Sequence, residues 1–420
     1  MQDYDYFCRC IHFLSPMSLD DILKKLDAET RSRMARKVPS WFSVIPGPDR
    51  ESLIFPSSLS TQQCSGEPAA LYKAQVAFQA LAADRIADLT GGLGVDSWAF
   101  SKCFEKVLYN EANSELAEAV KHNFEVLGCG NITVSNKLLK PGNLKEILGD
   151  FKPDIIFLDP ARRSAAGKKV FLLEDCQPDV LKLKEELLAA SPNLLLKLSP
   201  MADITMLLQR LGPAVRQLHV VAFDGECKEL LLLLQRGWSG PVELILHEDG
   251  ITLGPFDRTS APAPGEDNAN AADVRPGAIL FEPGKALLKA GLFDYPCTLG
   301  YTKLAKHTHL YIAPDSFQET SFPTGSGISL PGKYFRIEKV LPLQSKTIKE
   351  IARQGIAAEV STHNVPIKAE DLKKRLRATP SATTHLFAAA GVNADYIIIA
   401  SVILDARSRS GMTRISSSDT

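Results

Sequence analysis

The sequence predicts an α/β protein whose main part is a doubly wound, largely parallel sheet. Between about residues 66 and 237, short apolar segments alternate with amphipathic helical segments, and this alternation is typical of parallel sheets covered by helices. A glycine-rich turn joins the first strand to the first helix. A proline-rich break at 253–277 separates this part from small C-terminal α+β domains.

Composition places the chain among ordinary globular proteins. It has 420 residues, of which 45% are hydrophobic and 23% charged, and its formal net charge is −1. These values exclude wholesale disorder and a strongly basic polyelectrolyte, but not a local basic patch that binds nucleic acid. No apolar run of the sequence approaches the ~20 residues that a membrane span needs. The acidic N-terminus and the scattered cysteines favour a cytoplasmic protein without disulfides or a structural metal.

The elements of the main part follow one another regularly. Residues 1–65 are expected to form a helical N-terminal region, and residues 66–252 the α/β domain. The expected strands are 85–88, 106–109, 131–134, 154–158, 194–198, 219–223 and 230–235, with a helix from about 114 to 127. Because a short turn that includes Asp224-Gly225-Glu226 joins the last two strands, this pair should form an antiparallel edge of the sheet.

Two small units are expected beyond the linker at 253–277. In the first, 278–333, the segments 278–281, 286–290 and 310–313 suggest a small α+β module. The second is 334–405, and its expected strands are 335–338, 357–361, 385–389 and 396–402, with helices 345–354 and 369–377. The Ser/Arg-rich residues 406–420 have the composition of a disordered tail.

The segment that carries chemistry is Asp88-Leu89-Thr90-Gly91-Gly92-Leu93-Gly94-Val95-Asp96, at the turn from the first strand to the first helix. Glycines at such a turn let a ligand approach the backbone, and the N–H groups that begin the helix are available to bind it. Two acids follow at the ends of other strands, Glu111 after the second and Asp159 after the fourth. Open α/β sheets bind ligands at these carboxyl ends.

The charge of Asp88 distinguishes between two possible ligands, a dinucleotide and S-adenosylmethionine. A dinucleotide site would read G-x-G-x-x-G, but Ser97 takes the place of the third glycine after Gly92 and Gly94. Asp88 would repel a pyrophosphate, whereas it would attract the ammonium group of S-adenosylmethionine. Glu111 can accept both hydroxyls of a ribose. The residues therefore favour S-adenosyl-L-methionine as the cofactor.

With these motifs, residues 66–237 resemble the class I S-adenosylmethionine-dependent methyltransferases, which have a Rossmann-like sheet. Asp88 to Gly94 matches their D-x-x-x-G-x-G motif, and Glu111 matches their ribose-binding acid. Asp159-Pro160-Ala161-Arg162 stands where nucleobase methyltransferases have D-P-P-Y or D-P-P-R.

The whole chain is similar to a group of bacterial proteins that join such a domain to a small ferredoxin-like domain and a C-terminal THUMP-like, RNA-binding domain. The segments that carry this resemblance are Leu53-Ile54-Phe55-Pro56, Gln63-Cys64-Ser65, Tyr72-Lys73, Phe281-Glu282-Pro283 and Ser361-Thr362-His363-Asn364-Val365-Pro366.

The resemblance implies a site in two parts. The catalytic, acceptor-holding residues would be Asp159, Pro160 and Arg162. The cofactor-binding residues would be Asp88, Thr90, Gly91, Gly92, Gly94, Asp96, Glu111, Ala112, Asn136 and Asp159. Asn136 stands where the family commonly has an acid or amide for the adenine amino group. No metal is implied.

The segment Asp159-Pro160-Ala161-Arg162, which is the fourth motif of the family, departs from the family pattern. The identity of the atom that accepts the methyl group therefore stays open. Ala161 and Arg162 stand where amine methyltransferases have a proline and an aromatic residue. Asp159 could still orient an exocyclic amine, while Arg162 or Arg163 would stack on a base or bind a phosphate. Methylation at carbon 5 of a pyrimidine would need a thiolate, for which Cys227 is the candidate, although a structural cysteine is the commoner case.

The remaining candidates have structural explanations too. Cys64 and Lys197 could line the site, but a core cysteine and a solvated lysine explain them as well. His307 and His309 alternate along one extended segment, and two ligands without a third do not make a metal site. The basic patch on helix 369–377 is either a solvated helix face or a set of phosphate contacts. The basic run is Lys368, Lys373, Lys374, Arg375 and Arg377, and the expected nucleic-acid contacts among them are Lys373, Lys374 and Arg377.

The sequence thus predicts a cytoplasmic methyltransferase that uses S-adenosyl-L-methionine to methylate a nucleobase nitrogen in RNA, either tRNA or rRNA. Two alternatives remain open. One is a non-catalytic RNA-binding protein with a methyltransferase-like scaffold, and the intact Gly92, Gly94 and Glu111 argue against it. The other is a methyltransferase with a protein or small-molecule acceptor, and for a small acceptor the C-terminal module would be superfluous.

Overall fold

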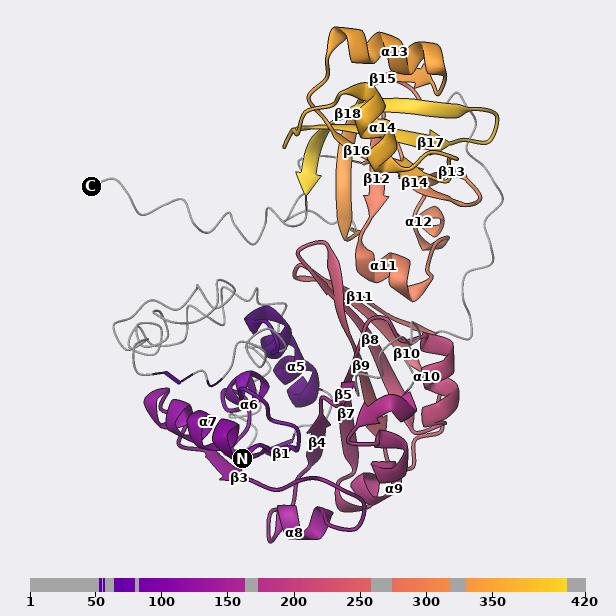
Figure 1. The fold of residues 1–420 in the computed structure, drawn as a ribbon. Helices are drawn as coiled ribbons and strands as arrows, with labels where there is room; N and C mark the ends of the chain where they lie inside the picture. The colour runs from indigo at the N-terminus through magenta and orange to yellow at the C-terminus, as the bar shows by residue number, and fades with distance from the viewer. Residues whose placement is uncertain are drawn as a thin grey trace, which may run out of the picture. The chain divides into compact units, whose positions relative to one another are not determined.

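The computed structural model describes residues 53–54, 56, 64–79, 83–162, 173–257, 274–317 and 330–405. The chain divides into two compact units, shown in Figure 1. Unit 1 comprises residues 1–221 and 228–245, and unit 2 comprises residues 222–227 and 246–420. Most of the expected N-terminal region 1–65 and all of the expected tail 406–420 lie outside the described residues. No helix of the described residues is long and apolar enough to span a membrane.

The first sheet has the order β11-β10-β8-β9-β7-β4-β1-β2-β3 among the described residues. The strands are β1 (Arg85–Asp88), β2 (Lys106–Asn110), β3 (Ile132–Ser135), β4 (Ile155–Leu158), β7 (Asn193–Leu198), β8 (Val215–Phe223), β9 (Glu226–Gln235), β10 (Glu243–Glu248) and β11 (Ile251–Asp257). β1 pairs in parallel with β2 and β4, as do β2 with β3 and β4 with β7, whereas β7 and β9 are antiparallel. This confirms the doubly wound α/β sheet expected from the sequence.

Helices cover both faces of this sheet. Figure 1 shows α5 (Glu67–Gln79), α6 (Val95–Phe100) and α7 (Ser114–Val126) on one face, and α9 (Val180–Ala190) and α10 (Ile204–Leu211) on the other. A short helix, α8 (Leu144–Leu148), lies between β3 and β4 in the sequence. The side chains of Asn113, Asp179 and Asp203 each accept a hydrogen bond from a backbone N–H at the start of α7, α9 and α10, which stabilises these helix starts.

The strand order reverses at β1. The chain runs outward from β1 to β2 and β3 and then returns to β4 on the opposite side of β1. Open α/β sheets bind ligands at this reversal, beyond the carboxyl ends of the strands. The turn after β1 and the residue after β4 therefore lie where a ligand is expected.

The β8–β9 pair departs from the expectation of a sheet edge. The two strands are joined by Asp224 and Gly225, whose φ angles of 55° and 74° are both positive, as a tight hairpin turn requires. The sheet nevertheless continues past β8 into β10 and β11. β11 includes Pro255 of the expected linker, and an edge strand tolerates proline because one of its sides has no ladder partner.

Unit 2 contains a second sheet, with the order β13-β14-β12-β15-β18-β17-β16 among the described residues. Its strands are β12 (Ile279–Pro283), β13 (Thr302–Ala305), β14 (Thr308–Ile312), β15 (Gly332–Pro342), β16 (Glu359–His363), β17 (Thr384–Ala390) and β18 (Asp395–Asp405). The helices are α11 (Lys285–Ala290), α12 (Tyr295–Thr298), α13 (Ser345–Gln354) and α14 (Ala369–Leu376). The sheet runs continuously through both ranges expected as separate units, 278–333 and 334–405, because β12 pairs with β15.

Two hydrophobic clusters stabilise this second sheet. One gathers residues from both expected ranges, including Leu280, Leu310, Phe335 and Phe387. The other packs Ile348 and Ile351 of α13 and Leu372 and Leu376 of α14 against the sheet, with the 3–4 residue spacing of a buried helix face.

Candidate functional site

The glycine-rich turn after β1 has one side packed and one side open. A Cβ atom at Gly91 would overlap the ring of Tyr109, and one at Gly94 would lie 2.6 Å from Cζ of Phe124. At Gly92, by contrast, nothing lies within 4 Å of the position of a Cβ atom. Gly91 and Gly94 therefore let the turn pack on the protein, and Gly92 presents its backbone to open space where a ligand can approach.

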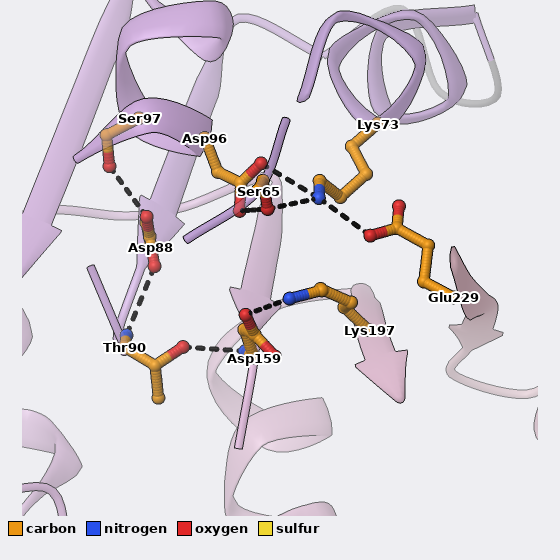
Figure 2. Close-up of polar contacts among 9 residues, drawn as sticks. All are labelled: Ser65, Lys73, Asp88, Thr90, Asp96, Ser97, Asp159, Lys197 and Glu229. Carbon is orange, nitrogen blue, oxygen red and sulfur yellow. Dashed lines mark hydrogen bonds and ion pairs between the residues drawn. The ribbon is translucent and has the colours of Figure 1, made fainter. Parts of the chain in front are cut away.

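Asp88 lies behind this turn and is only 1% exposed. Its carboxylate accepts hydrogen bonds from Ser97 Oγ at 2.7 Å and from the backbone N–H of Thr90 at 3.1 Å, as Figure 2 shows. Burial raises the pKa of Asp88 to about 8, against the opposing effect of these hydrogen bonds. In the structure Asp88 thus holds the turn to the start of α6, and its predicted interaction with a cofactor stays a prediction.

Glu111 lies beside the open glycine. One carboxylate oxygen accepts a hydrogen bond from the backbone N–H of Gly92 at 3.0 Å, and the other accepts one from Asn113 at 2.8 Å. Asn136 donates to the backbone carbonyl of Glu111 at 2.6 Å, and Ala112 is exposed. The structure therefore brings Gly92, Glu111, Ala112 and Asn136 to one side of the turn.

Asp159 connects the turn to the end of β4. Its backbone N–H donates to Thr90 Oγ1 at 2.6 Å, and its carboxylate lies 2.5 Å from Lys197 Nζ. Pro160 is buried. Arg162 pairs through β5 (Ala161–Arg162) with β6 (Cys176–Gln177), but its side chain lies outside the described part of the chain, so its role in holding the acceptor stays a prediction.

A buried ionic network lies next to the Asp159–Lys197 pair (Figure 2). Lys73 on α5 is fully buried, and its Nζ lies 3.0 Å from Asp96 and 3.1 Å from Glu229 on β9. Lys73 also donates to Ser65 Oγ at 2.7 Å, and Ser65 donates to Asp96 at 2.8 Å. Asp96, predicted as a cofactor residue, is therefore engaged within the protein.

The cluster holds more carboxyl groups than ammonium groups. Lys73 and Lys197 face the acids Asp96, Asp159 and Glu229. Burial alone would lower the pKa of Lys197, but the three acids outweigh it and raise the pKa above its usual value. Lys197 therefore keeps its proton at neutral pH. Burial raises the pKa of Glu229, against the opposing effect of Lys73 and Lys197.

Cys64, one of the two cysteine candidates, does not provide a thiolate. Burial raises the pKa of Cys64 to about 12, with Asp96 adding to the effect against Lys197 and Lys73. Cys64 thus lies near the cluster but is protonated at neutral pH, and thiols in that form are poor nucleophiles. Cys227 is half-buried on β9.

The histidine and basic-patch candidates lie in unit 2. The described residues contain no group of three or more potential ligands that could hold a metal ion. α14 ends at Leu376, and Arg377 follows with a left-handed φ of 53°. Lys374 and Arg377 are exposed and Lys373 is half-buried. These three residues belong to a different unit from the predicted cofactor residues.

Several residues of the site were given no role from the sequence. Lys73 and Glu229 form the network, and Tyr109 donates to the carbonyl of Gly92 at 2.6 Å. Asn110 bonds the backbones of Leu89 and Lys137. The available signal was a lone charged or polar residue within an apolar element: Lys73 interrupts an apolar helix, and Glu229 precedes five leucines.

Two segments of unit 2 match known protein families. Residues 280–323 match a ferredoxin-like domain, and residues 332–401 match a THUMP domain-like family. No curated protein matches the chain.

Among solved structures, the chain is similar to a putative methyltransferase from Porphyromonas gingivalis W83. The identity is 25%, the TM-score is 0.70, and the alignment covers 92% of this chain and 99% of that one. A putative methyltransferase from Escherichia coli has 18% identity and a TM-score of 0.28, with coverages of 44% and 90%. An rRNA methylase from Streptococcus thermophilus has 12% identity and a TM-score of 0.29, with coverages of 39% and 94%.

The first of these likenesses spans nearly the whole chain. Together with the two domain matches, it confirms the resemblance expected from the sequence: a methyltransferase-like α/β part followed by ferredoxin-like and THUMP-like domains.

Proposed function

We propose that this protein is an S-adenosyl-L-methionine-dependent methyltransferase that modifies RNA. The observation that carries the proposal is the turn after β1, where Gly92 faces open space next to the carboxylate of Glu111 and Thr90 bonds to Asp159 at the end of β4. These residues suit the proposed cofactor. Glu111 has lone pairs left for ribose hydroxyls, and the acid-rich cluster suits a sulfonium.

Bound S-adenosylmethionine would supply a methyl group already activated by its sulfonium. The chain's own residues then have to bind and orient. Glu111 would hold the ribose, and the open side of Gly92 would let the nucleoside lie close to the backbone, while Asn136 is bonded to the backbone of Glu111. Asp159, fixed by Thr90 and Lys197, would hold the acceptor in line with the methyl group. Such positioning can contribute several kcal/mol, about 7–11 in the best intramolecular cases.

The RNA part of the proposal is supported by unit 2. Residues 332–401 match a THUMP domain-like family, and α14 ends in basic residues. The chain is nearly neutral overall, so a polyanion would need such a local patch. We propose Lys373, Lys374 and Arg377 as phosphate contacts.

Glu111→Gln is expected to weaken S-adenosylmethionine binding by about tenfold or more, because a charge-assisted hydrogen bond to a ribose hydroxyl is worth about 1.5–3 kcal/mol. Titration calorimetry on the full chain measures the affinity. Glu125→Gln, an exposed acid on α7, is the matched control and should bind as the wild type does. If the wild type fails to bind S-adenosylmethionine, or prefers NAD, the proposed function is wrong.

Replacing Lys373, Lys374 and Arg377 together by glutamine is expected to lower the affinity for RNA. The affinity of the variant should also depend less steeply on salt concentration. Three lost phosphate contacts should reduce the slope of log K against log salt by about 2–3. Filter binding with unmodified rRNA and tRNA transcripts at several salt concentrations measures this.

The control for this triple variant removes equal charge from exposed positions of α13, by Lys346→Gln, Lys349→Gln and Arg353→Gln. Equal losses in both triple variants would mean that only net charge matters. No loss in the α14 variant would exclude this helix as the RNA anchor. S-adenosylmethionine affinity should be unchanged in both.

A further inference from the structure

The ion pair of Asp159 and Lys197 lies at the ends of two adjacent parallel strands. Leu158 of β4 is paired with Leu196 of β7, so the residues that follow stand side by side. Lys197 Nζ lies 2.5 Å from Asp159 Oδ2, and the two side chains are 16% and 31% exposed. The pair therefore places a hydrogen-bond acceptor and a donor together, and neither side chain is fully buried.

The donor of this pair is held in its charged form. Glu229 and Asp96 act with Asp159 to raise the pKa of Lys197 against the effect of burial. Glu229 and Asp96 are in turn fixed by the buried ammonium group of Lys73. Lys197 thus acts as a hydrogen-bond donor at neutral pH, and the proton acceptor of the pair is the carboxylate of Asp159.

This arrangement distinguishes oxygen from nitrogen acceptors. A hydroxyl has one O–H donor and two lone pairs. Between Asp159 and Lys197 it can donate to the carboxylate, accept from the ammonium group, and keep one lone pair for the methyl group. A ring nitrogen or an exocyclic amine has a single lone pair, and a hydrogen bond from Lys197 would occupy the electrons needed for attack.

Ala161, the residue that follows Pro160, also favours an oxygen acceptor over a base nitrogen. Methyltransferases that act on a flipped base gain from an aromatic surface on which the base can stack. Ala161 offers none, and its small side chain is exposed. The described residues at the end of β4 thus provide the pair for a hydroxyl but no stacking surface for a base.

We propose that the acceptor atom is the 2′-hydroxyl oxygen of an RNA ribose, bound directly by Asp159 and Lys197. This rests on the proposed function, which supplies RNA as the substrate, and it replaces the base nitrogen expected from the sequence. The 2′-hydroxyl is the hydroxyl that distinguishes RNA from DNA and is present at every internal nucleotide. Both Asp159 and Lys197 are then catalytic residues.

The reaction balances without a further reagent. A lone pair of the 2′-oxygen forms the new O–C bond, while the C–S bond breaks and its electron pair stays on sulfur. The proton of the hydroxyl passes to Asp159 and from there to water. Lys197 holds the oxygen in line throughout and keeps its own proton. The positive charge lost by the sulfur leaves as that proton.

The deciding experiment locates the transferred methyl group. The full-length protein is incubated with unmodified transcripts of bacterial rRNA and tRNA and with S-adenosylmethionine that carries a deuterated methyl group. After digestion to nucleosides, mass spectrometry breaks the glycosidic bond and shows whether the label is on the ribose or on the base. We expect the label on the ribose, and we expect no label when the modified nucleotide is replaced by its 2′-deoxy form.

The other outcomes separate this inference from the proposed function. Label on the base would overturn the hydroxyl acceptor and leave RNA methylation standing. A protein that binds S-adenosylmethionine but labels no RNA would overturn both.

Lys197→Met provides a second test, because it keeps the length of the side chain and removes the ammonium donor. Methyl transfer is expected to fall by about 100-fold or more through lost positioning of the oxygen, with S-adenosylmethionine affinity and melting temperature close to wild type. Lys182→Met, which breaks the exposed ion pair with Asp179, should retain full activity. A Lys197→Met variant that binds the cofactor and transfers methyl at the wild-type rate would overturn the role given to Lys197.

Discussion

Replacing Lys73 by methionine is expected to lower the free energy of unfolding by about 3–5 kcal/mol, because it leaves buried carboxyl groups without their cation. The ammonium group of Lys73 is fully buried between Asp96 and Glu229, each about 3 Å away. Methionine fills a similar volume, so the loss reports the charge and hydrogen bonds rather than a cavity. Chemical denaturation of the wild type and the variant measures the difference.

Two further variants make this result specific. Lys182→Met removes an exposed ion pair, and such pairs contribute only about 0–1 kcal/mol. The double variant Lys73→Met/Glu229→Gln removes a carboxylate together with its cation, so it should regain part of the lost stability. A Lys73→Met protein as stable as Lys182→Met would show that the buried network does not contribute to folding.

The position of Lys73 predicts that stability and the proposed function are connected in this unit. The network fixes Glu229 and Asp96, and these acids keep Lys197 protonated beside Asp159. A substitution at Lys73 should therefore disturb the reactive pair even though Lys73 itself is out of reach of any substrate. This separates a positioning residue from the residues that touch the acceptor.

Local patterns predicted most of the elements correctly. The strand at 85–88 and the helix at 345–354 were expected with the same bounds as β1 and α13, because hydrophobic periodicity and the flanking turn residues are properties of neighbouring residues. The end of α14 differs by one residue: Arg377 adopts a left-handed φ of 53°, a position where glycine is the usual signal.

Long-range pairing could not be predicted in the same way. Lys73 and Glu229 are separated by 156 residues, and nothing in either segment indicates the other. The charge of Asp88 was the basis for predicting its contact with the ammonium group of the cofactor. Burial, however, raises the pKa of Asp88 to about 8. This burial depends on how α6 packs over β1, which the sequence does not show. The strand β11 was not predicted because it contains Pro255. A proline in a sequence indicates a break in a strand unless that strand is known to lie at the edge of a sheet.

Substitutions of Gly94 and Gly92 by alanine should affect stability and cofactor binding to different extents. Gly94→Ala should lower the free energy of unfolding by about 2–5 kcal/mol, through backbone strain and overpacking. Its φ is 75°, and the added Cβ atom would lie 2.6 Å from Phe124 and 2.7 Å from Val120, both side chains of α7. Denaturant unfolding of the full chain measures this loss.

Gly92→Ala should behave differently, because its φ of 52° is also positive but nothing lies within 4 Å of the added atom. Backbone strain alone should then lower stability by about 1–2 kcal/mol. The new methyl group would point into the space assigned to the cofactor, so S-adenosylmethionine affinity should fall by about tenfold or more through lost close approach to the backbone. Calorimetry at a temperature where both variants are folded compares them directly. If Gly92→Ala binds the cofactor as tightly as the wild type, the open side of the turn is not where the cofactor lies.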